Sequence, residues 1–138
     1  MKNGKGLYIH EAGEYYEGEW KQNAPDGYGT LKSLNPFLVY KGEWEKGMKN
    51  GKGIEEYKDG SMYSGEFRKG KKNGHGKFEY ADGTYYEGNF DHNTIDGEGT
   101  YVGKFHRYKG EWKNGKMHGT GRSEWFNSEG ETISTYFG

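Results

Sequence analysis

Aromatic and polar residues alternate in five short segments along the chain. Tyr, Gly and then Trp or Phe stand at every second position of residues 16–20, and the same pattern begins again at Tyr40, Tyr63, Tyr86 and Tyr108. The residues between them are polar in all five segments. Because successive side chains of a strand point to opposite faces, this period of two predicts strands with one aromatic face and one solvent-exposed polar face.

The five segments belong to a repeat with a rigid part and a variable part. Their starts lie 22 to 24 residues apart. A Gly-x-Gly follows each segment, and its first glycine always lies seven residues after the Trp or Phe. The distance from the second glycine to the next Tyr varies, so length differences are confined to the links between repeats. The glycine pairs are Gly27/Gly29, Gly51/Gly53, Gly74/Gly76, Gly97/Gly99 and Gly119/Gly121.

The gap before each Gly-x-Gly contains turn-forming residues. Three residues after the aromatic stand Asn23, Gly47, Gly70, Asn93 and Gly115, and six residues after it stand Asp26, Asn50, Asn73, Asp96 and His118. Gly, Asn, Asp and His are the residues that best tolerate positive φ, so both positions are predicted to adopt it. Each repeat is therefore predicted to be a strand, a tight loop and a second strand that begins at the Gly-x-Gly.

Turns are also predicted between repeats, at Asp59-Gly60, Asp82-Gly83 and Glu129-Gly130. The first link, residues 32–37, contains Pro36 and is predicted to be an irregular loop. The positions two and four residues after each Gly-x-Gly are enriched in aromatic residues and share the face of the glycines. The whole pattern predicts an all-β meandering antiparallel sheet in which rings pack over glycines of neighbouring strands.

Composition supports a thin aromatic core and excludes several functions. Gly accounts for 26 of 138 residues and aromatic residues for 17%, whereas a layered Leu/Val core is not available. The net charge is −1, so no global positive field would attract nucleic acid. The absence of cysteine excludes disulfides and fits a reducing compartment. No stretch approaches the 18 apolar residues of a membrane-spanning helix.

The repeat Tyr-x-Gly-x-Trp-x-x-Gly-x-x-(Asn/Asp/His)-Gly-x-Gly, followed by Asp-Gly, resembles the MORN (membrane occupation and recognition nexus) repeat. The resemblance implies an elongated, twisted single-layer antiparallel meander of β-hairpins over residues 1–138. Five repeats over 16–132 start at positions 16, 40, 63, 86 and 108. Residues 1–15 match the second half of a repeat, and 133–138 are expected to form a C-terminal capping strand.

The resemblance also implies a function. MORN proteins are mostly eukaryotic organisers of ciliary, flagellar and cytoskeletal structures, and some bind a partner helix or peptide along an aromatic groove. By this resemblance the chain is expected to be a non-catalytic scaffold in the cytoplasm, associated with the cytoskeleton or a cilium, and without a cofactor. The expected groove residues are Tyr16, Trp20, Tyr40, Trp44, Tyr63, Phe67, Tyr86, Phe90, Tyr108 and Trp112. A purely structural role as the core of the repeats is the main alternative for them.

A peripheral membrane adaptor is the alternative function, since phosphoinositide binding is also attributed to the family. The most basic loop contains Arg68, Lys69, Lys71 and Lys72, which would face an anionic headgroup. The same residues also suit a solvated hairpin tip, and the balanced charge of the chain favours the scaffold. Self-association is expected through the apolar edge 133–137. The five histidines are not spaced as metal ligands, and Gly-x-Gly without a following helix or Gly-Lys-Ser/Thr does not indicate nucleotide binding.

Overall fold

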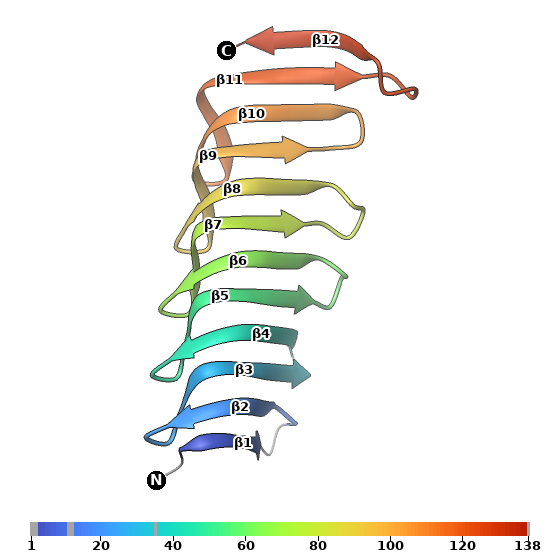
Figure 1. Ribbon diagram of the computed structural model, residues 1–138. Coiled ribbons are helices and arrows are strands. Elements are labelled where there is room, and N and C mark those ends of the chain that lie inside the picture. The colour runs from blue at the N-terminus through green and yellow to red at the C-terminus, as the bar shows by residue number, and fades with distance from the viewer. Residues whose placement is uncertain (1–2, 11–12, 35, 138) are drawn as a thin grey trace.

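The computed structural model describes residues 3–10, 13–34 and 36–137, and these form a single antiparallel sheet of twelve strands. Strands that follow one another in the chain are neighbours in the sheet, so the predicted meander is confirmed (Figure 1). The strands are β1 (Gly4–Ile9), β2 (Tyr15–Lys21), β3 (Ala24–Leu34), β4 (Phe37–Glu45), β5 (Met48–Tyr57), β6 (Met62–Arg68), β7 (Lys71–Glu79), β8 (Tyr85–Asp91), β9 (Thr94–Val102), β10 (His106–Lys113), β11 (Lys116–Phe126) and β12 (Thr132–Phe137).

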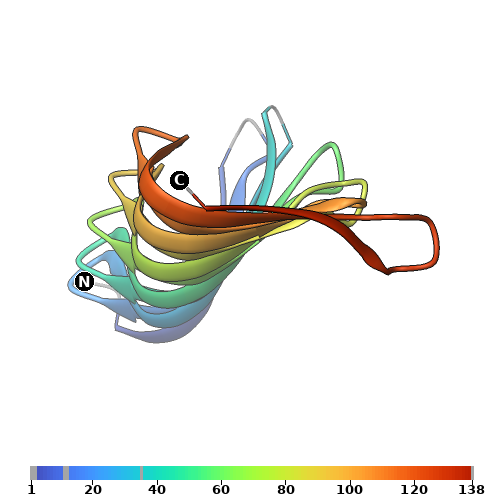
Figure 2. The ribbon, with the colours of Figure 1, turned by 90° about the horizontal axis from the view of Figure 1, so that it is seen from above.

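The sheet is one layer thick and elongated along its stacking direction (Figure 1). Eleven spacings of about 4.8 Å between strands correspond to roughly 50 Å from β1 to β12. Viewed along this direction, the strands twist progressively, and the ends that carry the hairpin tips curl over (Figure 2). The expected half repeat corresponds to β1, with residues 1–2 and 11–12 outside the described part of the chain. The expected capping strand corresponds to β12, with residue 138 outside it.

A continuous row of paired glycines crosses the middle of the sheet. In the central repeats Gly53 pairs with Gly65, Gly65 with Gly76, and Gly76 with Gly88. A Cβ on Gly65 would overlap the Cα of Gly76, so there is no room for a side chain there. Because glycine has no side chain, the tyrosine ring of one strand can lie over the neighbouring strand, as predicted from the sequence.

The hairpin tips are two-residue turns in which both residues have positive φ, as in type I′ turns. The Gly or Asn three residues after the aromatic has positive φ in all five repeats, which confirms that prediction. The residue before it also has positive φ, although Gln22, Lys46 and Lys69 are residue types without a preference for that conformation. Each second strand begins immediately after this turn, three residues earlier than the predicted start at Gly-x-Gly.

Positive φ was wrongly predicted six residues after the aromatic. Among the described residues, the Asp, Asn or His at that position does not adopt it, and the following glycine does, with φ of +103° at Gly74. This glycine forms an irregularity in the pairing of the two strands of its own hairpin. The Glu66 carboxylate fills the space beside it and accepts a 2.6 Å hydrogen bond from the His75 backbone N–H. Glu19, Glu43 and Glu111 make the equivalent bond, so these polar-face residues stabilise the bend of the strand.

The Asp or Asn at that position links consecutive hairpin tips. The Asn73 side-chain oxygen accepts a 3.2 Å hydrogen bond from the backbone N–H of His92 in the next turn. Beside it, the Asn93 N–H donates to the carbonyl of Lys72 at 2.9 Å. Asp26, Asn50 and Asp96 accept in the same way from the following turn. The tips are therefore joined into a ladder that fixes how one repeat sits on the next.

The first link is more regular than its sequence predicted. The strands β3 and β4 remain paired up to Leu34 and Phe37, so residues 32–34 are part of a strand rather than an irregular loop. Within this link, Asn35 lies outside the described residues. The additional residues of this link extend β3 and β4, because pairing satisfies their backbone hydrogen bonds and a longer loop would not.

Candidate functional site

The rings of the aromatic face form a zigzag of perpendicular pairs that is repeated along the chain. Tyr63 packs edge-to-face against Phe67 of its own repeat and Phe90 of the next, with ring centroids 5.1 and 5.0 Å apart. The same contacts run through every repeat from Tyr16 to Trp112. Edge-to-face pairs place the positive rim of one ring on the negative face of another, which favours this arrangement. Four of the tyrosines thus join two repeats each: Tyr16, Tyr40, Tyr63 and Tyr86.

The polar ends of these rings are also satisfied. The Tyr63 hydroxyl donates a 2.8 Å hydrogen bond to the backbone carbonyl of Glu66, three residues along the same strand, so the strand bends around the ring. The Trp44 indole N–H donates to the carbonyl of Gly29 at 3.0 Å. Burial raises the pKa of Tyr16 and of Tyr86 to about 12, because the ionised phenolate would lose its hydration there.

The residues expected to line the groove form the core of the array. Tyr40, Tyr63 and Tyr86 are fully buried, and Trp20 is the one member of the set that is only half-buried. The set is Tyr16, Trp20, Tyr40, Trp44, Tyr63, Phe67, Tyr86, Phe90, Tyr108 and Trp112. Their role as a partner groove stays a prediction, and a partner would reach little of their surface directly. They form the floor beneath any ligand on this face.

More accessible rings lie beside this floor, towards the links between repeats. Phe78 of β7 stacks on Tyr57 of β5 with centroids 5.7 Å apart and contacts Tyr80 at 4.9 Å. Further along the sheet, His106 of β10 stacks on Trp125 of β11 at 4.9 Å. Tyr80 and Trp125 are the exposed members, at 39% and 37%. Their signal in the sequence was the aromatic enrichment two and four residues after Gly-x-Gly.

A groove of about 270 Å³ adjoins these rings. It is lined by Lys72, Phe78, Tyr80, Phe90, Asn93, Thr94, Ile95 and Gly115, from β7, β8, β9 and the neighbouring hairpin tips. Its walls are mostly apolar, and Lys72 is the cationic side chain within it. An apolar concavity with a few polar groups is the usual form of a binding site.

A buried polar cluster lies next to the groove and was not predicted. The Glu55 carboxylate accepts hydrogen bonds from the Lys49 ammonium at 2.5 Å and the Tyr57 hydroxyl at 2.6 Å. The Lys72 ammonium lies 3.7 Å from the same carboxylate. Burial lowers the pKa of Lys72, and the negative charge of Glu55 opposes this shift. Burial raises the pKa of the Tyr57 phenol, and its hydrogen bond to Glu55 raises it further.

The expected headgroup residues are not brought together as one patch. Arg68, Lys69 and Lys71 line a cleft of about 490 Å³ at their hairpin tip, together with Asn73, Asp91 and His92. Lys72 pairs with Phe67 in the register of β6 and β7, so it lies on the aromatic face, whereas Arg68 pairs with Lys71 on the opposite side. Of the four cationic residues predicted to bind a headgroup, three therefore lie together at the tip, and the carboxylate of Asp91 lies beside them. Lipid binding by them stays a prediction.

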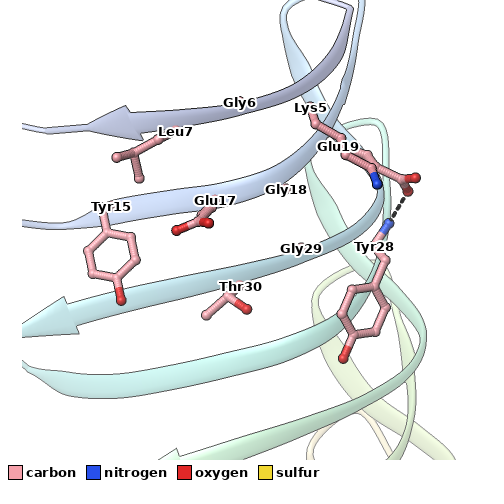
Figure 3. Close-up of a pocket in the computed structure, with 10 residues that line it drawn as sticks. All are labelled: Lys5, Gly6, Leu7, Tyr15, Glu17, Gly18, Glu19, Tyr28, Gly29 and Thr30. Carbon is pink, nitrogen blue, oxygen red and sulfur yellow. Dashed lines mark hydrogen bonds between the residues drawn. The ribbon is translucent and has the colours of Figure 1, made fainter.

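The opposite face carries a larger hollow of about 640 Å³ near β1, β2 and β3 (Figure 3). Leu7 and Tyr28 are exposed there, and the Glu19 carboxylate accepts a hydrogen bond from the Tyr28 backbone N–H. The Glu19 carboxylate therefore already has a hydrogen-bond partner within its own hairpin. The side chains of this hollow stand apart and do not converge on one point (Figure 3).

Over the described residues, no helix is long and apolar enough to cross a membrane. In the same part of the chain, no group of three or more His, Asp or Glu side chains is arranged to hold a metal ion.

The five repeats seen in the geometry agree with a comparison of the sequence with known families. The MORN repeat model matches residues 16–33, 40–62, 63–85, 86–104 and 108–129, which together cover most of the chain. The chain belongs to the MORN repeat family. MORN repeats are generally protein- or membrane-interaction modules without enzymatic activity. No curated protein matches the chain.

Proposed function

We propose that this MORN array is a non-catalytic scaffold that binds a helix or peptide of a partner protein along its aromatic face. The observation that carries the proposal is the strip of accessible rings, with Phe78, Tyr80 and Trp125 beside the buried zigzag. The accessible rings form two groups, one around Tyr80 and one around Trp125, on the same face of the sheet. Exposed aromatic surface favours an interface, and Tyr and Trp are enriched among residues that dominate binding energy. The resemblance of the repeats to those of cytoskeletal and ciliary organisers supports a cytoplasmic assembly of this kind as the setting that we propose for the scaffold.

The architecture suits an elongated ligand. The floor beneath the rings is fixed by hydrogen bonds and edge-to-face contacts that repeat along the whole sheet, so the exposed rings are held in place before binding. A preorganised surface loses little side-chain entropy when a partner arrives. Because a single-layer sheet has no second layer over this face, a partner segment can lie across several repeats. Association of two copies through β12 is the additional contact that we propose for the scaffold.

Anionic lipid binding is the second candidate, at the tip cleft of Arg68, Lys69 and Lys71. The exposed cations favour it, and the neighbouring Asp91 opposes it. With Lys72 on the other face, the tip supplies three cations, each contributing about 1 kcal/mol near an anionic surface. This attraction would decrease strongly with added salt. The protein-binding proposal is therefore the better supported of the two.

The test selects helix-forming and extended peptides from a displayed random library on the intact chain. Tyr80→Ser and Trp125→Ser are each expected to weaken the binding of the selected peptides by about 2 kcal/mol, because each removes an accessible ring. Tyr28→Ser is the matched control, since Tyr28 is an exposed ring on the opposite face. Peptides that bind all variants equally would contradict the proposal. Salt-sensitive binding to phosphoinositide vesicles that is lost in an Arg68→Ser, Lys69→Ser, Lys71→Ser triple variant would favour the lipid adaptor instead.

A further inference from the structure

The aromatic face carries charge at one place among the described residues of its middle rows. Glu55 occupies the position two residues after Gly-x-Gly, where the other copies have Tyr8, Leu31, Phe78, Tyr101 and Ser123. Lys49 and Lys72 occupy the position five residues after the aromatic, where the other copies have Pro25, Ile95 and Met117. Three charged residues thus replace uncharged ones in two adjacent repeats, and the structure brings them together.

The cluster has one positive charge in excess. Glu55 contributes one negative charge, and Lys49 and Lys72 contribute two positive charges. The carboxylate is already bound closely by Lys49 at 2.5 Å and by the Tyr57 hydroxyl at 2.6 Å. Lys72, at 3.7 Å, is the looser partner. The excess charge therefore resides mainly on Lys72.

Lys72 is in an environment where a further anion would be bound strongly. Its side chain is only 15% exposed, and its ammonium lies 5.3 to 5.9 Å from the ring centroids of Tyr57, Tyr63 and Phe78. Rings and a neighbouring strand replace much of the water around it. A charge pair formed in such a partly desolvated place is less screened than a pair at the surface. Lys72 also lines the groove of about 270 Å³ with Tyr80 and Ile95, so an occupant of the groove meets it.

We propose that this groove recognises an acidic side chain of the partner, an Asp or Glu flanked by apolar residues, whose carboxylate pairs with Lys72 while the apolar residues contact Tyr80 and Ile95. The inference rests on the proposed function and specifies its partner as an acidic, amphipathic peptide segment. Glu55 tunes the site, because its negative charge offsets part of the positive charge that the partner carboxylate meets. The cluster would thereby select one register of the partner along an otherwise repetitive face.

The experiment uses the intact chain and peptides obtained from the displayed random library. For a selected peptide, the acidic residue is replaced by its amide, Glu by Gln or Asp by Asn, and both forms are titrated by fluorescence anisotropy. Lys72→Met is expected to weaken the binding of the acidic peptide by about tenfold or more and to change the binding of the amide peptide much less. Lys72→Met leaves Glu55 bound to Lys49 and Tyr57, so the variant is expected to fold, and thermal melting verifies this.

Glu55→Gln provides a change of opposite sign. It keeps the shape of the side chain and removes the negative charge, so the acidic peptide is expected to bind more tightly than to the unmodified protein. A purely structural cluster would weaken binding in both variants. Lys71→Met is the matched control, since Lys71 is adjacent in sequence but lies on the other face of β7. Lys71→Met is expected to leave the affinity of both the acidic and the amide peptide unchanged.

The outcomes separate this inference from the proposed function. Peptides that require Tyr80 but show no acidic preference, or that respond equally to Lys72→Met in acid and amide forms, would overturn the acidic-partner inference alone. Peptides indifferent to Tyr80→Ser and Trp125→Ser would overturn the proposed function as well. If Lys72→Met instead reduced binding to phosphatidylserine vesicles and left the peptides unaffected, the ligand of Lys72 would be a lipid and the inference would be wrong.

Discussion

The ring of Tyr63 lies directly over Gly76 of the neighbouring strand. A Cβ on Gly76 would come within 2.5 Å of the tyrosine ring atoms and closer still to the hydroxyl oxygen, so the ring occupies the volume that any other residue would need. The ring cannot move aside cheaply, because its hydroxyl is bonded to the Glu66 carbonyl and its edge packs on Phe67 and Phe90. Each repeat is stabilised by the same relationship between a ring and a missing side chain.

Gly76→Ala is therefore expected to destabilise the array by about 2–3 kcal/mol, the usual effect of overpacking. Gly6→Ala is the matched control, because Gly6 stands in the same glycine row but a Cβ there would contact Trp20 at an ordinary 3.5 Å. Urea unfolding followed by circular dichroism compares the two. Equal unfolding midpoints would contradict the role of ring-over-glycine packing.

The meander and its aromatic face could be predicted from the sequence because they depend on features that recur in every copy. Alternation, paired glycines and turn residues appear five times, so an exception in one copy does not obscure the pattern. The two-residue turns were only half predicted, because Lys69 has positive φ although lysine has no preference for it. Its conformation follows from the turn and the strand twist rather than from its side chain.

The candidate site could not be predicted as fully, since it arises from departures from the repeat. Glu55, Lys49 and Lys72 are unremarkable polar residues until the register places them on one face. The sequence alone predicts one basic cluster of Arg68, Lys69, Lys71 and Lys72, since these residues lie within a single loop. The second strand begins at Lys71, three residues before the predicted start, and alternation from there sends Lys71 and Lys72 to opposite faces.

Stability is expected to decrease at alkaline pH. Burial raises the pKa of Tyr16 and Tyr86 from 10.0 to about 12 in the folded protein, so folding favours the neutral phenol. Their contribution is fully present below pH 10, the unfolded value, and is lost as the pH rises from 10 through 12. Urea midpoints measured across this interval, with tyrosinate absorbance recorded in parallel, should fall as the phenols ionise. Tyr86→Phe should make this decrease shallower, and an unchanged slope would exclude Tyr86 as a contributor.

Self-association of this chain is expected through β12. Ile133, Tyr136 and Phe137 are 65%, 62% and 70% exposed on the outer strand of the described sheet. An edge strand presents backbone groups to a second strand, and its apolar side chains add to the contact. Deleting residues 131–138 should lower the dimer fraction in sedimentation. Leu7→Lys, on the opposite edge strand, should leave it unchanged, and the reverse result would place the contact at β1.

The ladder of hairpin tips gives a prediction about coupling between repeats. The Asn73 side chain accepts a hydrogen bond from the His92 N–H, so Asn73→Ala leaves a turn amide without this partner. The expected loss is about 0.5–1.5 kcal/mol, because the amide lies near solvent and water replaces part of the bond. Asn73→Asp should restore the bond, since Asp26 and Asp96 make it elsewhere in the array.

His118 offers the control within the same chain. It stands at the position equivalent to Asn73, and β12 follows it in place of another hairpin of this kind, so no later tip docks on it in the described sheet. His118→Ala should therefore leave the unfolding midpoint within about 0.5 kcal/mol of the unmodified protein. Hydrogen exchange at the His92 amide reports the ladder bond directly, and it should accelerate in Asn73→Ala and return to normal in Asn73→Asp. Unchanged protection in Asn73→Ala would mean that the two hydrogen bonds between Asn93 and Lys72 hold the tips together without Asn73. In these bonds the Asn93 N–H donates to the Lys72 carbonyl, and the Lys72 N–H donates to the Asn93 side-chain oxygen.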